Sequence, residues 1–354
     1  MTIRSSLSCF LSIALAFGAF GATPKKTAAK PVTVKAKAKT TAVAKAKVAA
    51  KPAAAPVQTA HRRSPYVGAI SADAQTGQVL FADNADVEAY PASVTKLMTL
   101  LLVLEDVKAG KYGLDDLVTA TADAYRSEPS WVGIKVDEKM SVRCLCMALM
   151  VESANDAAMV LGVHSAGSFE AFVARMNARA AELGMKHTHY YNPNGLPPNA
   201  AKRYPWKSFN TTTARDQLLL ARELVKRPET VSFTSVKTCD LVKTAGGYRT
   251  SVTRRVNEPL KETQLAEGEK IVKQLRNHNN VMRTDKLKII NADGKEAVDG
   301  LKTGYIDAGG SSVVLTGKRA GKRVIVVVLG SSSAKERDQH AGRLMEDALS
   351  AVAW

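Results

Sequence analysis

The sequence has few cysteines, and their spacing does not suit a metal. Of four cysteines in 354 residues, Cys9 lies in the N-terminal apolar run, which leaves Cys144, Cys146 and Cys239. Cys144 and Cys146 are too close in an apolar helical pattern to bridge each other easily. Either could pair with Cys239 in a compartment that permits disulfides. The CLCMALM segment is typical of a core, which favours buried free thiols.

The sequence also lacks the motifs of metal sites, of phosphate-binding loops and of Ser-His-Asp hydrolases. His187 and His189 are two potential ligands on one strand face, but no third ligand stands at a sensible spacing, so an exposed strand is the better interpretation. No glycine-rich phosphate loop is present, and the six histidines show no His–Asp pattern typical of a Ser-His-Asp hydrolase. We therefore expect neither a metal nor a cofactor.

Long hydrophobic runs are absent after the N-terminus. Residues 1–22 hold Arg4, the apolar run CFLSIALAFGAF and then small residues. This is the layout of a secretory signal peptide cleaved near Gly21 or Ala22. Because the run is short for a transmembrane helix, an uncleaved anchor is the less favoured alternative. The sequence predicts export across the inner membrane, to the periplasm or the cell wall.

Acidic and aromatic residues are absent from residues 23–65. Its nine Lys and two Arg contribute +11 to the formal net charge of +17. When the charge of Arg4 is subtracted as well, +5 remains for the chain from Tyr66 onward. A composition of Ala, Lys, Pro, Thr and Val cannot bury enough apolar surface to fold, so we expect a disordered basic linker. After an export signal, anionic envelope polymers are favoured over nucleic acid as its partner. A solvated spacer without a partner is the alternative.

From Tyr66 to Trp354 the pattern becomes that of one folded domain. VGAISADAQTGQVLFADNAD predicts a hairpin, and AVDGLKTGY, SSVVLTGKR and KRVIVVVLG predict three strands before a C-terminal helix. Apolar helical segments, among them 93–106 and 142–153, lie between them. These elements predict one α+β domain, in which N- and C-terminal strands share an antiparallel sheet with helices packed around it and an all-helical insertion.

The first residues that could carry chemistry stand at the head of an apolar helix, in PASVTKLMTLLLVLED. Ser93 and Lys96 are three residues apart and therefore lie on one helix face. A serine hydroxyl needs a base within hydrogen-bond reach to act as a nucleophile. Desolvation by the Leu and Met run would lower the pKa of the Lys96 amine and suit it to that role. An N-cap serine beside a snorkelling lysine is the alternative, and the pair alone does not exclude it.

Two downstream motifs favour the catalytic interpretation. Ser153-Ala154-Asn155 follows the second apolar helix, and Lys302-Thr303-Gly304 lies on a predicted strand. Each is weak alone. Ser-x-x-Lys, Ser-x-Asn and Lys-Thr-Gly in this order, each on the expected element, form the motif set of penicillin-recognising serine enzymes.

Over essentially all of residues 66–354 the chain resembles the D-alanyl-D-alanine peptidases among the low-molecular-mass penicillin-binding proteins. The segments ASVTKLMTLLLVLE, SANDAAMVLG, YYNPNGL, TTARD and DGLKTGYIDAGG follow the order of that family. The region from Gly195 to Arg276 departs from it, being longer and including AKRYPWKSF and the stretch around VTRRVNEPLKETQLAEGEK. Surface elaboration is the favoured interpretation of these insertions, and substrate contact is the alternative.

The resemblance implies a role for each motif residue. Ser93 attacks the carbonyl between two D-alanines and forms an acyl-enzyme, while Lys96 takes its proton. Ser153, helped by Lys302, relays a proton to the leaving amine. The backbone N–H groups of Ser93 and Tyr305 form the oxyanion hole. The implied substrate-binding residues are Asn155, Lys302, Thr303, Gly304, Tyr305 and Arg337, of which Thr303 and Arg337 bind the terminal carboxylate and Arg337 has the poorest local match.

The implied partners are peptidoglycan stem peptides and, as covalent inhibitors, β-lactam antibiotics. A serine β-lactamase is an alternative, but it needs a deacylating glutamate in an E-x-x-L-N-like loop. Glu182 is followed by LGMKH and does not fit. A catalytically silent cell-wall binder is disfavoured because every catalytic position is filled. Carboxypeptidase and endopeptidase activity both stay open, although the short extension after Lys-Thr-Gly resembles the endopeptidase-type members.

Overall fold

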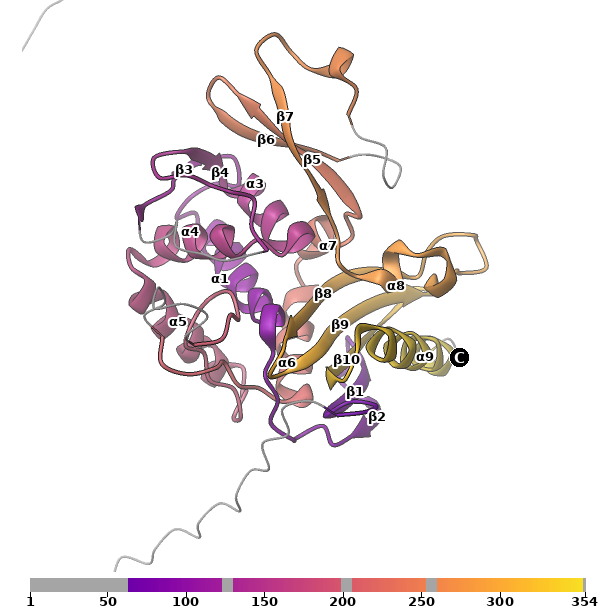
Figure 1. Cartoon of the computed structure of the whole chain (residues 1–354). Coiled ribbons are helices and arrows are strands. Elements are labelled where there is room, and N and C mark those ends of the chain that lie inside the picture. Colours follow the sequence, from indigo (N-terminus) through magenta and orange to yellow (C-terminus); the bar gives the residue numbers. More distant parts are fainter. Residues whose placement is uncertain (1–62, 123–129, 199–205, 253–259, 353–354) are drawn as a thin grey trace, which may run out of the picture. The chain divides into compact units, whose positions relative to one another are not determined.

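A computed structural model describes residues 63–122, 130–198, 206–252 and 260–352 (Figure 1). The predicted signal peptide and most of the predicted basic linker lie outside these residues. The contacts of the described chain begin at Arg63, whose backbone N–H donates to the carbonyl of Gly330 at 3.0 Å. Within the described part, no single helix is long and apolar enough to cross a membrane. Only helices Asn155–Ala166 and Phe169–Glu182, bent by 86°, meet those criteria as a pair.

The centre of the fold is a five-stranded antiparallel sheet in the order β2-β1-β10-β9-β8. Ile70 of β1 pairs with Val327 of β10, so strands from the two ends of the sequence are neighbours, as predicted. The α+β fold class is thereby confirmed. The strands are β1 (Gly68–Asp73), β2 (Val79–Asp83), β8 (Val298–Ile306), β9 (Gly310–Arg319) and β10 (Lys322–Ser331).

Both faces of this sheet are covered, which explains why β10 is an almost continuous run of β-branched residues. Because side chains alternate along a strand, Val327 belongs to a core shared with the inner helices, whereas Val326 packs with Met345 of the C-terminal helix. Figure 1 shows that helix, α9 (Ala334–Val352), lying along the sheet. The inner helices include η1 (Ala92–Thr95), α1 (Lys96–Lys108), α4 (Asn155–Ala166), α5 (Phe169–Glu182) and α6 (Ala214–Val225).

Helix α1 is buried around almost its whole circumference, as its apolar sequence requires. The second predicted apolar helix has two parts, because α3 (Val142–Met147) continues as a π-helix, η2 (Ala148–Glu152). Side-chain caps start three helices: Ser141 for α3, Ser168 for α5 and Thr213 for α6. The smaller elements of this part are β3 (Leu117–Thr119), β4 (Lys139–Ser141) and α7 (Pro228–Thr234).

A separate three-stranded sheet was not predicted. It has the order β6-β5-β7 and lies in the region that sequence analysis left as insertions (orange in Figure 1). Its strands mix Lys, Thr and Arg with Ile, Val and Leu and show no clean period of two. Its elements and those that follow are β5 (Thr238–Thr244), β6 (Gly247–Val252), η3 (Glu262–Gln264), β7 (Lys270–Arg276), α8 (Asn280–Arg283) and η4 (Asp285–Leu287).

Three cysteines, Cys144, Cys146 and Cys239, are free and buried, which confirms the favoured interpretation of buried thiols. Burial raises the pKa of the Cys146 thiol to about 12. At neutral pH the thiol is therefore protonated and behaves as a small apolar side chain.

Candidate functional site

The three motif segments meet around a pocket of about 420 Å³. The first motif comes from η1 and the start of α1, the second from the junction of η2 and α4, and the third from β8. Among the described residues, none that lines the pocket is acidic, whereas Arg337 does line it. The lining residues are Ser93, Ser130, Ser153, Asn155, Gly195, Leu196, His278, Asn280, Thr303, Gly304, Tyr305, Ile306, Ala334 and Arg337.

The Lys96 amine lies directly beside the Ser93 hydroxyl. Its Nζ is 2.9 Å from Ser93 Oγ, 2.7 Å from Asn155 Oδ1 and 2.7 Å from the carbonyl oxygen of Asn194. A neutral amine has two N–H donors and one lone pair. With the two donors directed to Asn155 and Asn194, the lone pair is left to face the serine hydroxyl. The contacts therefore suit an amine that accepts the proton of Ser93.

Burial favours that neutral form. Lys96 is fully buried, and loss of solvent holds the pKa of its amine well below the usual lysine range. The positive charge of Lys302 lowers the pKa further, while the carboxylate of Asp156 opposes the shift. The apolar helix is thus the environment that favours the neutral form of the Lys96 amine.

The second motif is held by an unusual backbone conformation. Ser153 caps the π-helix η2 with φ 61° and ψ 32°, in the left-handed region that few non-glycine residues occupy. After this turn, the backbone N–H of Asn155 donates to the carbonyl of Ser130 at 2.7 Å. This arrangement places Ser153 and Asn155 on one wall of the pocket, beside Ser130.

Strand β8 supplies the opposite wall and needs glycine to come close. A Cβ on Gly304 would lie 2.5 Å from the Pro91 carbonyl and 3.1 Å from the Ser93 nitrogen, so only glycine fits there. Thr303 is buried in the pocket wall, whereas Tyr305 is exposed and its hydroxyl donates to Asp307 at 2.7 Å. The strand therefore lies directly against the backbone of the nucleophile segment.

Two cationic side chains gather at one end of the site. Lys302 is buried and donates to the Thr303 carbonyl at 2.9 Å. Arg337, the predicted site residue with the poorest local match, lies in the first turns of α9 and lines the same pocket as Thr303. Asp338 holds the Arg337 guanidinium at 2.6 Å, and both side chains are buried. An anionic group entering the pocket would meet this positive charge.

The lowered pKa of Lys302 predicts how the free energy of unfolding depends on pH. Burial and the charge of Arg337 lower its pKa to about 7. Between pH 7 and its ordinary value near 10.5, the unfolded chain binds a proton there that the folded chain does not. The free energy of unfolding should thus rise through this window by up to about 1.4 kcal/mol per pH unit, and fall as the pH falls toward 7. Urea unfolding at pH 7, 8 and 9 should show a smaller slope in Lys302→Met, and equal slopes would contradict this account.

Several residues of the site were missed by sequence reasoning. The carbonyl of Asn194 accepts from Lys96, and the YYNPNGL segment that carries it was noted without a role. Gly195, at φ 83°, lies so close to Ala92 that a Cβ would be 1.8 Å from its carbonyl oxygen. His278 lines the pocket, and loss of solvent and neighbouring positive charges lower its pKa to about 4. Asn-Pro-Asn-Gly was a visible turn signal for the first two, whereas nothing in the sequence singled out His278.

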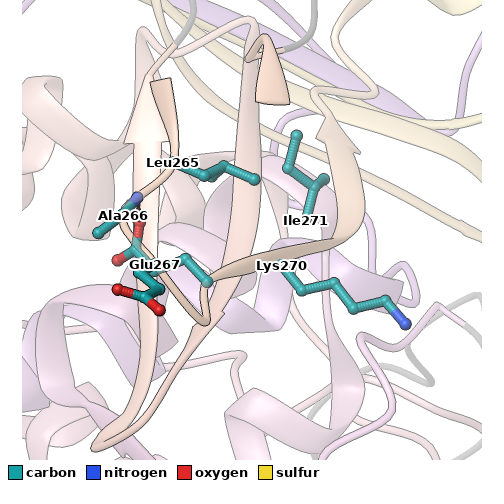
Figure 2. A pocket seen from close by; sticks show the side chains of 6 residues that line it. Leu265, Ala266, Glu267, Lys270 and Ile271 are labelled. Atoms are coloured by element: carbon teal, nitrogen blue, oxygen red, sulfur yellow. Dashed lines mark hydrogen bonds between the residues drawn. The ribbon is translucent and has the colours of Figure 1, made fainter. Parts of the chain in front are cut away.

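Another pocket, of about 390 Å³, lies where the chain enters β7 (Figure 2). It shares no lining residue with the Ser93 pocket and carries no serine, cysteine or histidine. Its Glu269 is paired with Arg249 at 2.6 Å. The chemistry-bearing residues therefore point to the Ser93 pocket as the functional site. The lining residues, drawn in Figure 2, are Leu265, Ala266, Glu267, Glu269, Lys270 and Ile271.

The histidine pair considered above does not form a metal cluster. His189 pairs with Thr211 in an isolated antiparallel bridge. In the part of the chain that the structure describes, no group of three or more His, Cys, Asp or Glu side chains is arranged to hold a metal ion.

Comparisons with known proteins place this geometry in context. The profile of a family described as D-alanyl-D-alanine carboxypeptidase matches residues 57–333. The D-alanyl-D-alanine carboxypeptidase DacA of Escherichia coli K12 is 30% identical over 280 residues, which are 77% of this chain and 58% of DacA. A D-alanyl-D-alanine endopeptidase of Pseudomonas aeruginosa is 35% identical over 156 residues, 43% of this chain and 46% of that protein.

A solved structure is similar as well. Penicillin-binding protein D2 from Listeria monocytogenes, in its ampicillin-bound form, has a TM-score of 0.60 and 28% identity. The similarity covers 80% of this chain and 97% of that one. The chain spans about three fifths of the length of the carboxypeptidases it matches, with shares of 61%, 60% and 58% in three of them.

Proposed function

Because the chain belongs to the D-alanyl-D-alanine carboxypeptidase family, we propose that it is a serine peptidase that cleaves the bond after a D-alanine in peptidoglycan stem peptides. The observation that carries the proposal is the contact of a buried lysine amine with a serine hydroxyl, 2.9 Å apart, beside a pocket that Arg337 also lines. Such a substrate lies outside the cytoplasm, in agreement with the predicted signal peptide.

In the proposed acylation step, Ser93 Oγ attacks the carbonyl carbon and Lys96 takes the hydroxyl proton. The backbone N–H groups of Ser93 and Tyr305 stabilise the oxyanion as charge develops on it. Ser153 relays the proton held by Lys96 to the leaving amine, which departs as the ester to Ser93 forms, so that Lys96 is neutral again. Water then attacks that ester, with Lys96 again as the base, and releases the acid and the free serine.

The positive end of the pocket gives the substrate its direction. Thr303 offers a hydroxyl, and Arg337 and Lys302 offer positive charge, to the α-carboxylate that follows the scissile bond. Asp338 pairs with the arginine and is itself held by Asn280, whose Nδ2 donates to Asp338 Oδ2 at 3.0 Å. The guanidinium is therefore held in place before the substrate arrives.

A β-lactam would be captured by the same serine, since its ring amide takes the place of the scissile bond. Release from a β-lactam ester would need a further base positioned for water. Glu182, which the sequence already disfavoured, lies at the end of α5, where it pairs with Arg179 at 3.0 Å, and it does not line the pocket. This supports a penicillin-binding peptidase over the alternative of a β-lactamase.

Purified muropeptides test the proposal. We expect release of free D-alanine from pentapeptide stems, detected by amine analysis. Splitting of cross-linked dimers would instead support endopeptidase activity, which the similarity to the Pseudomonas aeruginosa endopeptidase favours as a second candidate. Absence of both products, from protein shown to be folded by circular dichroism, would contradict the proposed function.

A further inference from the structure

One lysine of the unpredicted three-stranded sheet contacts two segments that lead into the walls of the Ser93 pocket. Lys273 lies within β7 and pairs in register with Leu241 of the central strand β5, so its backbone is fixed by the sheet. Its Nζ donates to the Trp131 carbonyl at 2.6 Å and lies 2.8 Å from Glu152 Oε1. A single side chain of β7 thus joins two segments that are 21 residues apart in the sequence.

Glu152 connects this lysine to the second motif. Both of its carboxylate oxygens contact β7, because Oε2 also accepts from the backbone N–H of Arg276 at 3.1 Å. The next residue is Ser153, whose left-handed backbone conformation is held only when surrounding contacts over-determine it. The Glu152 side chain is mostly buried, with 15% exposed, whereas 34% of the Lys273 side chain is exposed.

Trp131 connects the same lysine to the other segment. It directly follows Ser130, which lines the pocket and whose carbonyl accepts from Asn155 N–H at 2.7 Å. The next residues, Val132 to Ile134, donate backbone N–H groups to the Asp156 carboxylate. The segment from Ser130 is therefore fixed on one side by α4 and on the other by β7.

We propose that Lys273 and Glu152 are positioning residues, through which the inserted sheet braces the pocket wall formed by Ser130, Ser153 and Asn155. Neither side chain lines the pocket, and each acts through the backbone of a neighbouring residue. The sheet thereby gains a role in catalysis, in contrast to the surface elaboration favoured by the sequence. The inference rests on the proposed function, because it assigns the wall a part in acylation.

The test measures the second-order rate of acylation by a fluorescent penicillin in full-length protein. We expect Lys273→Met and Glu152→Gln each to lower this rate by about tenfold to a hundredfold, because small displacements of catalytic groups have effects of this size. The double variant should lose little more than either single one, since both break the same contact. Lys273→Arg should restore most of the rate, because arginine can contact both partners.

Arg249→Met is the matched control, because it breaks a 2.6 Å ion pair between β6 and Glu269, the residue before β7, without touching the pocket wall. Its acylation rate should equal that of the wild type, whatever its melting temperature. The inference is overturned if Lys273→Met and Arg249→Met react at the same rate, or if the loss in Lys273→Met matches its unfolded fraction. A wild type that takes no label at all would instead contradict the proposed function, and the inference with it.

Discussion

Ser93→Ala should abolish release of D-alanine, with a fall of about 10⁴-fold or more in kcat/KM, because no other group can form the acyl-enzyme. The one hydrogen bond described for the Ser93 hydroxyl is its contact with the Lys96 amine, and the side chain is half-buried, so the fold should tolerate the change. Activity is measured as D-alanine released from a pentapeptide stem, and folding by thermal melting.

Ser232→Ala is the matched control for this variant, because Ser232 is exposed on α7 and its hydroxyl donates to the Glu229 carbonyl at 2.7 Å. It should retain wild-type activity. Retention of activity by Ser93→Ala, with a melting temperature equal to that of the wild type, would show that the reaction does not use this serine.

Lys96→Met should slow acylation by about 10²- to 10⁴-fold, the usual contribution of a general base. Methionine has nearly the same length and suits the apolar surroundings, so it removes the amine without opening a large cavity. Loss of the buried amine should not in itself destabilise the folded state. The only expected cost is the loss of its hydrogen bonds to Asn155 and Asn194. The rate of penicillin capture and the urea midpoint together report these effects.

Lys108→Met separates the base from the bulk of helix α1. Lys108 is exposed at the other end of the same helix and does not line the pocket. Its variant should acylate at the wild-type rate. If Lys96→Met were as fast as Lys108→Met, another group would have to accept the proton of Ser93.

The sequence could predict those helices and strands whose apolar pattern matches their burial in the folded protein. The apolar run after Lys96 could only be a buried helix, and the β-branched run of β10 could only be a covered strand. The order of Ser-x-x-Lys, Ser-x-Asn and Lys-Thr-Gly indicated that they would converge. The structure brings all three to one pocket, together with Arg337.

What the sequence could not predict depends on contacts between distant segments. Asn194 serves Lys96 through its backbone carbonyl, a group that every residue carries and that leaves no mark in the sequence. His278 enters the pocket because β7 leads directly into it. The sheet itself has no clear alternation, since Lys270 and Lys273 interrupt the apolar pattern of β7 and Lys273 makes its contacts outside the sheet.

The central claim is that Ser93 forms a covalent acyl-enzyme in this pocket. The most direct measurement is the intact mass of the full-length protein after brief exposure to penicillin, followed by peptide mapping of the adduct. We predict a single adduct of one penicillin per chain, on the peptide that contains Ser93. An unmodified mass, or an adduct on a peptide that lacks Ser93, would contradict the account.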